Sequence, residues 1–163
     1  MNTDKHGFYF SYLCLFMFIC GQIFLCIFCG EILMNIIKVN SVQREEMIDI
    51  TREVEYIVGE SSVKEGVCIL FTQHTTCGLT VNENADPHVK SDMLGFLRGL
   101  IPQFYEGFRH SEENSDAHIK SSLVGSSVTV PFQNGKLFLG RWQAIYLCEF
   151  DGVRERSVLL KII

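Results

Sequence analysis

The stretch GVCILFTQHTT, residues 66–76, passes from a continuous apolar run to a polar turn. An apolar run of this length after a glycine predicts a β-strand that is buried on both faces. The polar residues that follow predict a turn at the edge of the core, which is where rigid scaffolds commonly present reactive side chains. The sequence therefore places His74 at the edge of a candidate functional site.

Apolar periodicity and turn residues divide the chain on either side of this stretch into short elements. Strands are predicted at residues 36–39, 47–50, 79–81, 126–132, 136–142, 144–150 and 156–162. Helices are predicted at residues 52–58, 87–101 and 115–125. Together these elements predict one compact domain of mixed α and β structure, with strands dominating its second half.

Three dipeptides predict where elements begin and turn. Asp86-Pro87 is typical of a helix start, with Asp as the cap and Pro in the first turn. This helix N-terminus follows the His74 motif in the sequence, so we expect its free amides to favour an anion there. Asn134-Gly135 predicts a type I′ hairpin, because both residues tolerate positive φ. With Asp151-Gly152 as another turn, the last three strands are predicted to form a meander.

Length and charge limit the classes of protein to consider. The chain has 163 residues, which suits one domain with a substantial core. Its formal net charge of -5 comes without a basic run, so the electrostatic footprint of nucleic-acid binding is missing. We therefore expect no nucleic-acid partner.

The N-terminal segment 1–33 differs in kind from the domain at residues 34–163. Residues 7–30 contain no Lys, Arg, Asp or Glu, and a run of roughly 20 apolar residues is long enough to span a bilayer as a helix. If residues 8–29 are retained, we expect a membrane anchor; a cleaved signal peptide is the alternative. If translation instead starts at Met34, segment 1–33 is a non-native extension and we expect a cytoplasmic protein.

The first candidate for chemistry is His74 with the hydroxyls of Thr75 and Thr76. Histidine suits proton transfer near neutral pH, and its neutral ring is a good metal ligand. The two hydroxyls add donors for a phosphate or carbonyl oxygen. The alternative is a structural role in which His74 only bonds the backbone at the strand end.

The second candidate is the polar segment that contains His110 and His118. Two histidines eight residues apart do not share a helical face, so they meet only if His110 lies in a loop and His118 in the first helical turn. With His74 they form a three-histidine set that suits zinc or another divalent metal. A solvated loop is the alternative.

The third candidate is the segment around Trp142 and Gln143 with the arginines that follow. Trp142 suits a core anchor, and the Gln143 amide suits a ligand contact. Arg154 and Arg156 offer planar forks for phosphate, but ion pairs with Glu149 or Asp151 are an equal alternative.

Four ordered motifs together resemble the YjbQ family, also called the secondary thiamine-phosphate synthase family. The first is Phe71–Leu79, which contains His-Thr-Thr, and the second and third are Glu83–Pro87 and Asn114–His118. The fourth consists of two segments, Gly140–Gln143 and Glu149–Gly152. The resemblance covers residues 34–163. It implies an α+β fold with a β-sandwich-like mixed-sheet core and two or three helices, assembled as a homotrimer, with histidines lining a cleft. It also implies thiamine-phosphate synthase activity, in which a hydroxymethylpyrimidine diphosphate and a thiazole phosphate are coupled.

Residue chemistry and motif position assign roles under this resemblance. The predicted catalytic residues are His74, Glu83, Asp86 and His118. The predicted residues for a small phosphorylated substrate are Thr75, Thr76, Asn84, Asn114, Gln143 and Arg154. The predicted ligands of a divalent metal, zinc or magnesium, are His74, His110 and His118. Metal-dependent hydrolysis of a phosphate or amide bond and non-enzymatic binding of a metal or small ligand remain open as alternatives.

Three positions depart from the family pattern. Glu113 stands where the family usually has Gly, Arg141 replaces a small residue, and Val153 replaces a Pro. We expect Glu113 to adopt positive φ, at a cost of about 1 kcal/mol.

Overall fold

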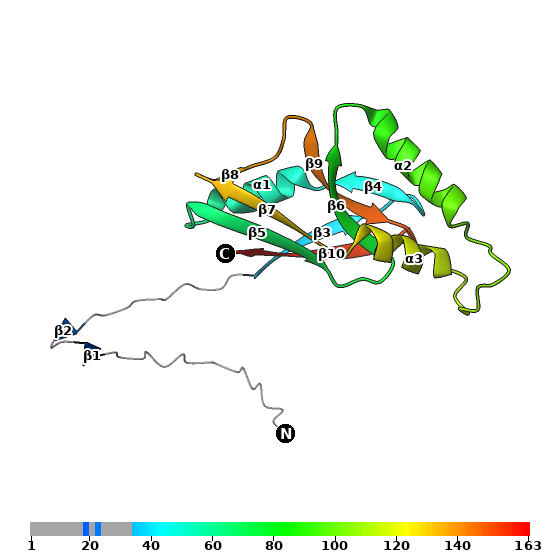
Figure 1. Cartoon of the computed structure of the whole chain (residues 1–163), viewed down its shortest axis with the longest axis horizontal. Helices are drawn as coiled ribbons and strands as arrows, with labels where there is room; N and C mark the ends of the chain where they lie inside the picture. Colours follow the sequence, from blue (N-terminus) through cyan, green and yellow to red (C-terminus); the bar gives the residue numbers. More distant parts are fainter. Residues whose placement is uncertain (1–17, 20–21, 24–33) are drawn as a thin grey trace, which may run out of the picture. The chain divides into compact units, whose positions relative to one another are not determined.

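The computed structural model describes residues 18–19, 22–23 and 34–163 (Figure 1). Strands β1 (Phe18–Ile19) and β2 (Gln22–Ile23) form an antiparallel pair. The predicted membrane helix at residues 8–29 and the proposed extension 1–33 fall largely outside these described residues. Over the part of the chain that is described, no helix is long and apolar enough to cross a membrane.

Two antiparallel sheets form the domain that follows. The larger sheet has the strand order β3-β10-β5-β7-β8, with the bounds Met34–Asn40, Glu155–Ile162, Glu65–Thr72, Ser127–Gln133 and Lys136–Leu137. The smaller sheet has the order β4-β9-β6, with the bounds Glu46–Asp49, Gln143–Glu149 and Cys77–Glu83. β9 pairs with both of its neighbours, since Cys148 lies opposite Met47 on one side and Gly78 on the other.

The main hydrophobic core lies between the two sheets. Leu70 and Leu160 of the larger sheet and Leu79 and Leu147 of the smaller one are buried in a single cluster. Helix α1 (Thr51–Glu60) contributes fully buried Val54 to it, from the helix face that its apolar spacing predicts. This arrangement confirms the predicted α+β class, with two antiparallel sheets and three helices around their core.

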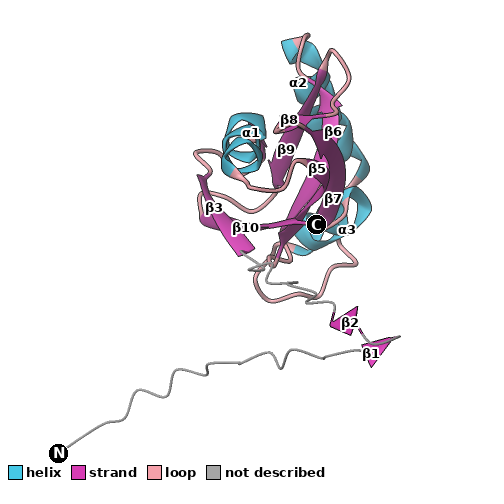
Figure 2. Cartoon of the chain, turned by 90° about the vertical axis from the view of Figure 1, so that its left-hand side faces the viewer, coloured by secondary structure: helices cyan, strands magenta, loops and turns pink. Residues whose placement is uncertain are grey.

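The opposite face of the smaller sheet is covered by helices α2 (Pro87–Leu100) and α3 (Ser115–Val124). Tyr146 and Cys148 of β9 are buried there with Ala117 of α3, and Leu97 of α2 packs against them. Figure 2 shows α2 and α3 on the side of this sheet away from α1. The smaller sheet is thus buried on both faces, and α3 is held directly over the end of β6.

Several local predictions are confirmed. The Asp86 carboxylate accepts the backbone N–H of His88 at 2.8 Å and so caps α2. Asn134 and Gly135 have φ of 53° and 73°, as a type I′ hairpin requires. Glu113 adopts a φ of 55° in the loop before α3, as expected.

Two strand predictions are wrong. Strand β5 is not buried on both faces, because Cys68 and Leu70 face the core while Phe71 on the other face is 42% exposed. Its sheet is antiparallel and has one face packed on the core, so continuous apolarity does not indicate double burial here.

The predicted meander of the last three strands is also wrong. β8 has only two residues and belongs to the larger sheet, β9 lies in the smaller sheet, and β10 returns to the larger one. Trp142, in the segment between β8 and β9, is 61% exposed rather than a core anchor.

Candidate functional site

Four segments converge on a polar cleft of about 380 Å³. They are the turn after β5, the loop before α3, α3 itself and the segment that joins β9 to β10. The cleft is lined by Gln73, His74, Thr75, Thr76, His110, Glu112, Asn114, His118, Asp151, Arg154 and Arg156. It therefore brings together seven of the residues that the sequence predicted, namely His74, Thr75, Thr76, His110, Asn114, His118 and Arg154.

His74 is held in one tautomer by the neighbouring strand. The backbone N–H of Ser157 in β10 donates to Nε2 of His74 at 2.9 Å, so Nε2 carries no proton. In the neutral ring the proton must then be on Nδ1. Burial, together with the positive charge of Arg156, lowers the pKa of His74 below its ordinary value. His74 is thus a neutral side chain whose Nδ1–H is the donor that remains for a ligand.

A buried ion pair supports the same part of the cleft. Arg156 donates from Nε to a carboxylate oxygen of Glu149 at 2.6 Å, and the two side chains are 5% and 0% exposed. Arg156 also donates to the Thr76 hydroxyl at 2.9 Å. The Glu149 carboxylate accepts the backbone N–H of Asp151 at 2.8 Å, which fixes the start of the segment that joins β9 to β10. The pair therefore ties the turn after β5 to that segment.

Asp151 organises the entrance of the cleft. Its carboxylate accepts a hydrogen bond from Nδ2 of Asn114 at 2.9 Å and one from Nη2 of Arg154 at 2.8 Å. Arg154 also donates from Nε to the Asp151 carbonyl at 2.8 Å, while its side chain remains half exposed. The predicted alternative of an ion pair is therefore correct for both arginines, and Arg154 keeps a second Nη group for a ligand.

His110 and His118 meet edge to face across the cleft, with ring centroids 5.2 Å apart and an interplanar angle of 70°. His110 comes from the loop before α3, and His118 is the fourth residue of that helix. This is the arrangement that their eight-residue spacing required. Both rings line the cleft, so a bound ligand can contact either imidazole.

The residues present do not fit a three-histidine metal centre. The Nε2 atom of His74 already accepts the Ser157 N–H, which leaves only the protonated Nδ1 toward a ligand. Within the described part of the chain, no group of three or more His, Cys, Asp or Glu side chains is arranged to hold a metal ion. The chemistry of the cleft is therefore derived from its side chains alone.

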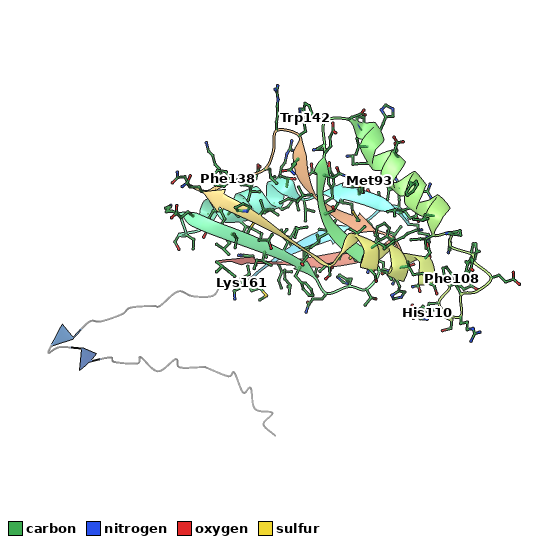
Figure 3. The ribbon with its side chains drawn as sticks, viewed as in Figure 1. Met93, Phe108, His110, Phe138, Trp142 and Lys161 are labelled. Carbon is green, nitrogen blue, oxygen red and sulfur yellow. The ribbon has the colours of Figure 1, made fainter. Side chains whose placement is uncertain are left out.

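Four predicted site residues lie elsewhere, at the far end of the β6–β9 pair. They are Glu83, Asn84, Asp86 and Gln143. The seven residues of β6 separate this end from the His74 end by about 20 Å. In Figure 3, Trp142, which precedes Gln143, lies at the top of the domain and His110 of the cleft at its lower right. The N-terminus of α2 is also at the far end, so it supplies no amides to the cleft, contrary to the prediction.

Residues at this far end have local structural partners. Asn84 donates to the Asp49 carboxylate at 2.8 Å, and Asp86 caps α2. The Gln143 side chain accepts the backbone N–H of Gly140 at 2.8 Å and so holds the turn before β9. Within the described residues, these bonds account for the side chains of Asn84, Asp86 and Gln143 without a ligand.

Three residues that line the cleft, Gln73, Glu112 and Asp151, were not predicted from the sequence as ligand contacts. Gln73 and Glu112 each lie within two residues of a predicted histidine or asparagine. Their proximity in sequence was the available signal. Asp151 was predicted as a turn residue and as an ion-pair partner of the arginines.

Comparisons with known proteins agree with this fold. A family model described as "UPF0047 protein YjbQ-like" matches residues 35–163. The chain is 52% identical over 127 residues to a UPF0047 protein of Methanocaldococcus jannaschii, which covers 78% of this chain and 90% of that protein. A crystal structure of an uncharacterised YjbQ/UPF0047 protein from Clostridium acetobutylicum matches with a TM-score of 0.77 and 46% identity, over 79% of this chain and 99% of that one. The crystal structure of a protein of unknown function from Sulfolobus solfataricus matches with a TM-score of 0.76 and 31% identity, over 81% of this chain and 96% of that one.

These relatives correct the predicted activity. They are described as UPF0047 proteins, as uncharacterised or as of unknown function, and none of the three is described as a thiamine-phosphate synthase. The prediction of synthase activity, which rested on the resemblance alone, is therefore wrong as a conclusion about this chain and is not retained.

Proposed function

Since the chain belongs to the YjbQ-like UPF0047 family, and the relatives that it matches carry no assigned activity, we propose a function from the cleft itself: it binds a small phosphorylated molecule. The observation that carries this proposal is the convergence of fixed hydrogen-bond donors in one polar cleft. Its volume of about 380 Å³ is in the range of sites for small molecules.

The donors come from separate segments but line the same space. Nδ1–H of His74 and the hydroxyl of Thr75 come from the turn after β5, and the remaining Nη group of Arg154 comes from the segment before β10. A phosphate group has only acceptor oxygens, so it can satisfy several donors at once, and charged donors strengthen these bonds. The Glu149–Arg156 pair behind these donors holds them in place before the ligand arrives.

The charges of the two arginines in the lining are paired. Arg154 is paired with Asp151 and Arg156 with Glu149, so each arginine that lines the cleft has its own carboxylate, and Glu112 is a further carboxylate in the lining. The hydrogen-bond donors that remain toward the cleft, rather than a net positive charge, favour a phosphate group there.

Calorimetric titration of the full chain with inorganic phosphate tests the proposal. We expect saturable binding that His118→Ala weakens by roughly tenfold, since one hydrogen bond to a charged group is lost. His88→Ala is the matched control, because the His88 side chain is 82% exposed at the far end. Absence of saturation, or equal binding by His118→Ala and the unaltered chain, contradicts the proposal.

Catalysis at this cleft is a further part of the proposal. The edge-to-face pair of His110 and His118 supports it, because a ligand bound beside two imidazoles lies within reach of proton transfer. Phosphorus NMR of the full chain with a mixture of phosphorylated metabolites distinguishes turnover from binding. New phosphorus signals that His118→Ala abolishes support an enzyme; broadened but unchanged signals support a binding protein.

We also propose that the chain assembles as the homotrimer that the resemblance implied. Support comes from α2, which has no buried residue and exposes 70% of Phe96 and 60% of Leu100. Large exposed apolar side chains that lie close together are typical of protein interfaces. Light scattering of the purified protein tests this, since three chains of 18.6 kDa each are expected in one particle. A particle of one chain contradicts it.

A further inference from the structure

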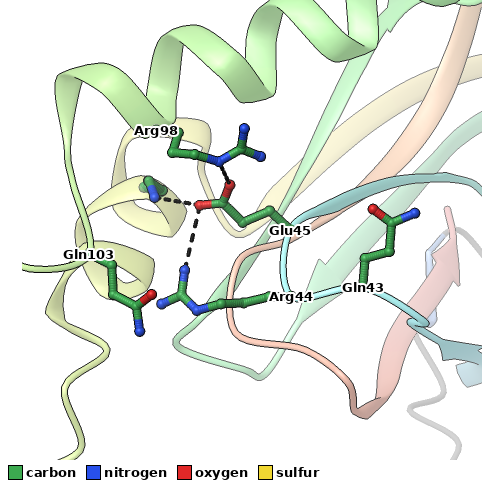
Figure 4. A pocket seen from close by; sticks show the side chains of 6 residues that line it. Gln43, Arg44, Glu45, Arg98 and Gln103 are labelled. Atoms are coloured by element: carbon green, nitrogen blue, oxygen red, sulfur yellow. Dashed lines mark hydrogen bonds and ion pairs between the residues drawn. The ribbon is translucent and has the colours of Figure 1, made fainter.

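A second pocket, of about 290 Å³, lies between the loop that joins β3 to β4, the last turn of α2, and α3 (Figure 4). It is lined by Gln43, Arg44, Glu45, Arg98, Gln103 and Lys120. None of these residues lines the cleft that carries His74. The charges and donors of this pocket can therefore be considered on their own.

The charged groups around the second pocket do not balance. The Lys120 ammonium is 1% exposed and donates to the carboxylates of Glu45 at 2.6 Å and Asp116 at 2.8 Å. Arg44 donates from both Nη atoms to Asp116, at 3.1 and 2.9 Å. Arg98 donates from Nε to Glu45 at 2.7 Å. Three cations thus share two carboxylates, which leaves one positive charge in excess.

Hydrogen-bond donors are in excess as well. Both carboxylate oxygens of Glu45 accept bonds from cations, whereas Arg98 uses only Nε of its five N–H groups. Lys120 uses two of its three donors, and the side-chain amides of Gln43 and Gln103 have no partner among the described residues. Each glutamine amide offers an acceptor oxygen as well as its donors, but the charged groups of the lining combine surplus donors with occupied carboxylate oxygens. This combination is complementary to a group that accepts, such as a carboxylate or a phosphate.

The net charge of the pocket favours a carboxylate over a phosphate. One excess positive charge matches a single negative charge. The second charge of a phosphate dianion would lie close to the carboxylates of Glu45 and Asp116, which repel it. Arg98, whose side chain is 61% exposed, provides an accessible planar fork that suits a carboxylate.

From this balance we propose that the second pocket binds the carboxylate group of a small molecule, at a site distinct from the cleft that carries His74. Arg98 is the principal contact, and Gln103 and Gln43 are neutral donors elsewhere in the lining. The buried Lys120 sets the excess charge from inside, while Glu45 and Asp116 exclude ligands with a second negative charge.

Nuclear magnetic resonance of the full chain titrated with acetate, against chloride at equal ionic strength, tests this proposal. We expect saturable shifts of the side-chain amides of Gln43 and Gln103 and of the Arg98 Nε–H. Arg98→Gln should weaken acetate binding by roughly tenfold or more. Arg141→Gln is the matched control, because it removes the same charge from an exposed loop residue and should leave binding unchanged.

Three results would overturn the proposal. They are the absence of saturable shifts at these side chains, an equal effect of Arg98→Gln and Arg141→Gln, and tighter binding of inorganic phosphate than of acetate at the same side chains. If Arg98→Gln does not fold, Gln103→Ala replaces it, since it removes one neutral donor from the lining. Unchanged acetate binding by Gln103→Ala then also contradicts the proposal.

Discussion

The two ends of the β6–β9 pair carry polar residues of similar kinds but engage them differently. At the end near His74, the side chains of His110, His118 and Arg154 line an open cleft. At the far end, Asn84 and Gln143 are hydrogen-bonded within the fold. Both ends contributed to the resemblance, yet only one forms a cleft that these residues line.

The difference between the two ends lies in what holds the polar side chains. At the cleft, a buried ion pair and a backbone N–H position the neighbouring groups from behind, so that donors remain available toward the cleft. At the far end, the side chains themselves hold the backbone in a turn or a helix cap. Variants at the cleft should therefore change ligand affinity, and variants at the far end should change stability alone.

The largest expected effect comes from the ion pair behind the cleft. Glu149→Leu should destabilise the fold by about 3 to 5 kcal/mol, because it leaves the buried Arg156 without its carboxylate. Urea unfolding measures this change. The double variant Glu149→Leu with Arg156→Leu is the control and should recover most of the lost stability. A single variant as stable as the unaltered chain contradicts the structural role of the pair.

A smaller effect, on affinity alone, is expected for the fixed donor of His74. His74→Phe should weaken phosphate binding by roughly tenfold, since a hydrogen bond to a charged group is lost. His74→Asn should retain part of the affinity, because its amide can still donate. Asn84→Ala at the far end is the control and should bind phosphate as the unaltered chain does. Calorimetry on the three variants measures these differences, and equal loss in His74→Phe and Asn84→Ala contradicts the distinction between the two ends.

The sequence predicted elements well where the signal is local. The cap at Asp86, the hairpin at Asn134-Gly135 and the loop and helix positions of His110 and His118 all depend on residues within one turn of the chain. The assignment of β9 and β10 to different sheets depends on pairing with distant strands, which periodicity does not encode. The separation of Glu83 and Gln143 from His74 was missed for the same reason: motif order in a sequence gives no distance in space.

The next prediction concerns the far end alone. Asp86→Ala should destabilise the fold by about 1 kcal/mol, which is the usual cost of losing a helix cap. Phosphate affinity should stay unchanged, since Asp86 does not line the cleft. Thermal unfolding and calorimetry on the same sample test both statements. A loss of affinity with native stability would instead place Asp86 in the functional site.

The smallest expected effect is the pH dependence that His74 adds to stability. Burial and the charge of Arg156 lower the pKa of His74 in the folded chain. Below the ordinary histidine pKa of about 6.5, the unfolded chain therefore binds more protons at this position than the folded chain does. The contribution of His74 to the free energy of unfolding is therefore complete above a pH of about 6.5, and it is lost as the pH falls toward the lowered pKa of the folded chain. Urea unfolding across this range should show a steeper decline for the unaltered chain than for His74→Asn, which has no titratable group there. Parallel declines would mean that the Ser157 N–H does not hold the ring neutral, and that the His74 end of the cleft is less rigid than its hydrogen bonds indicate.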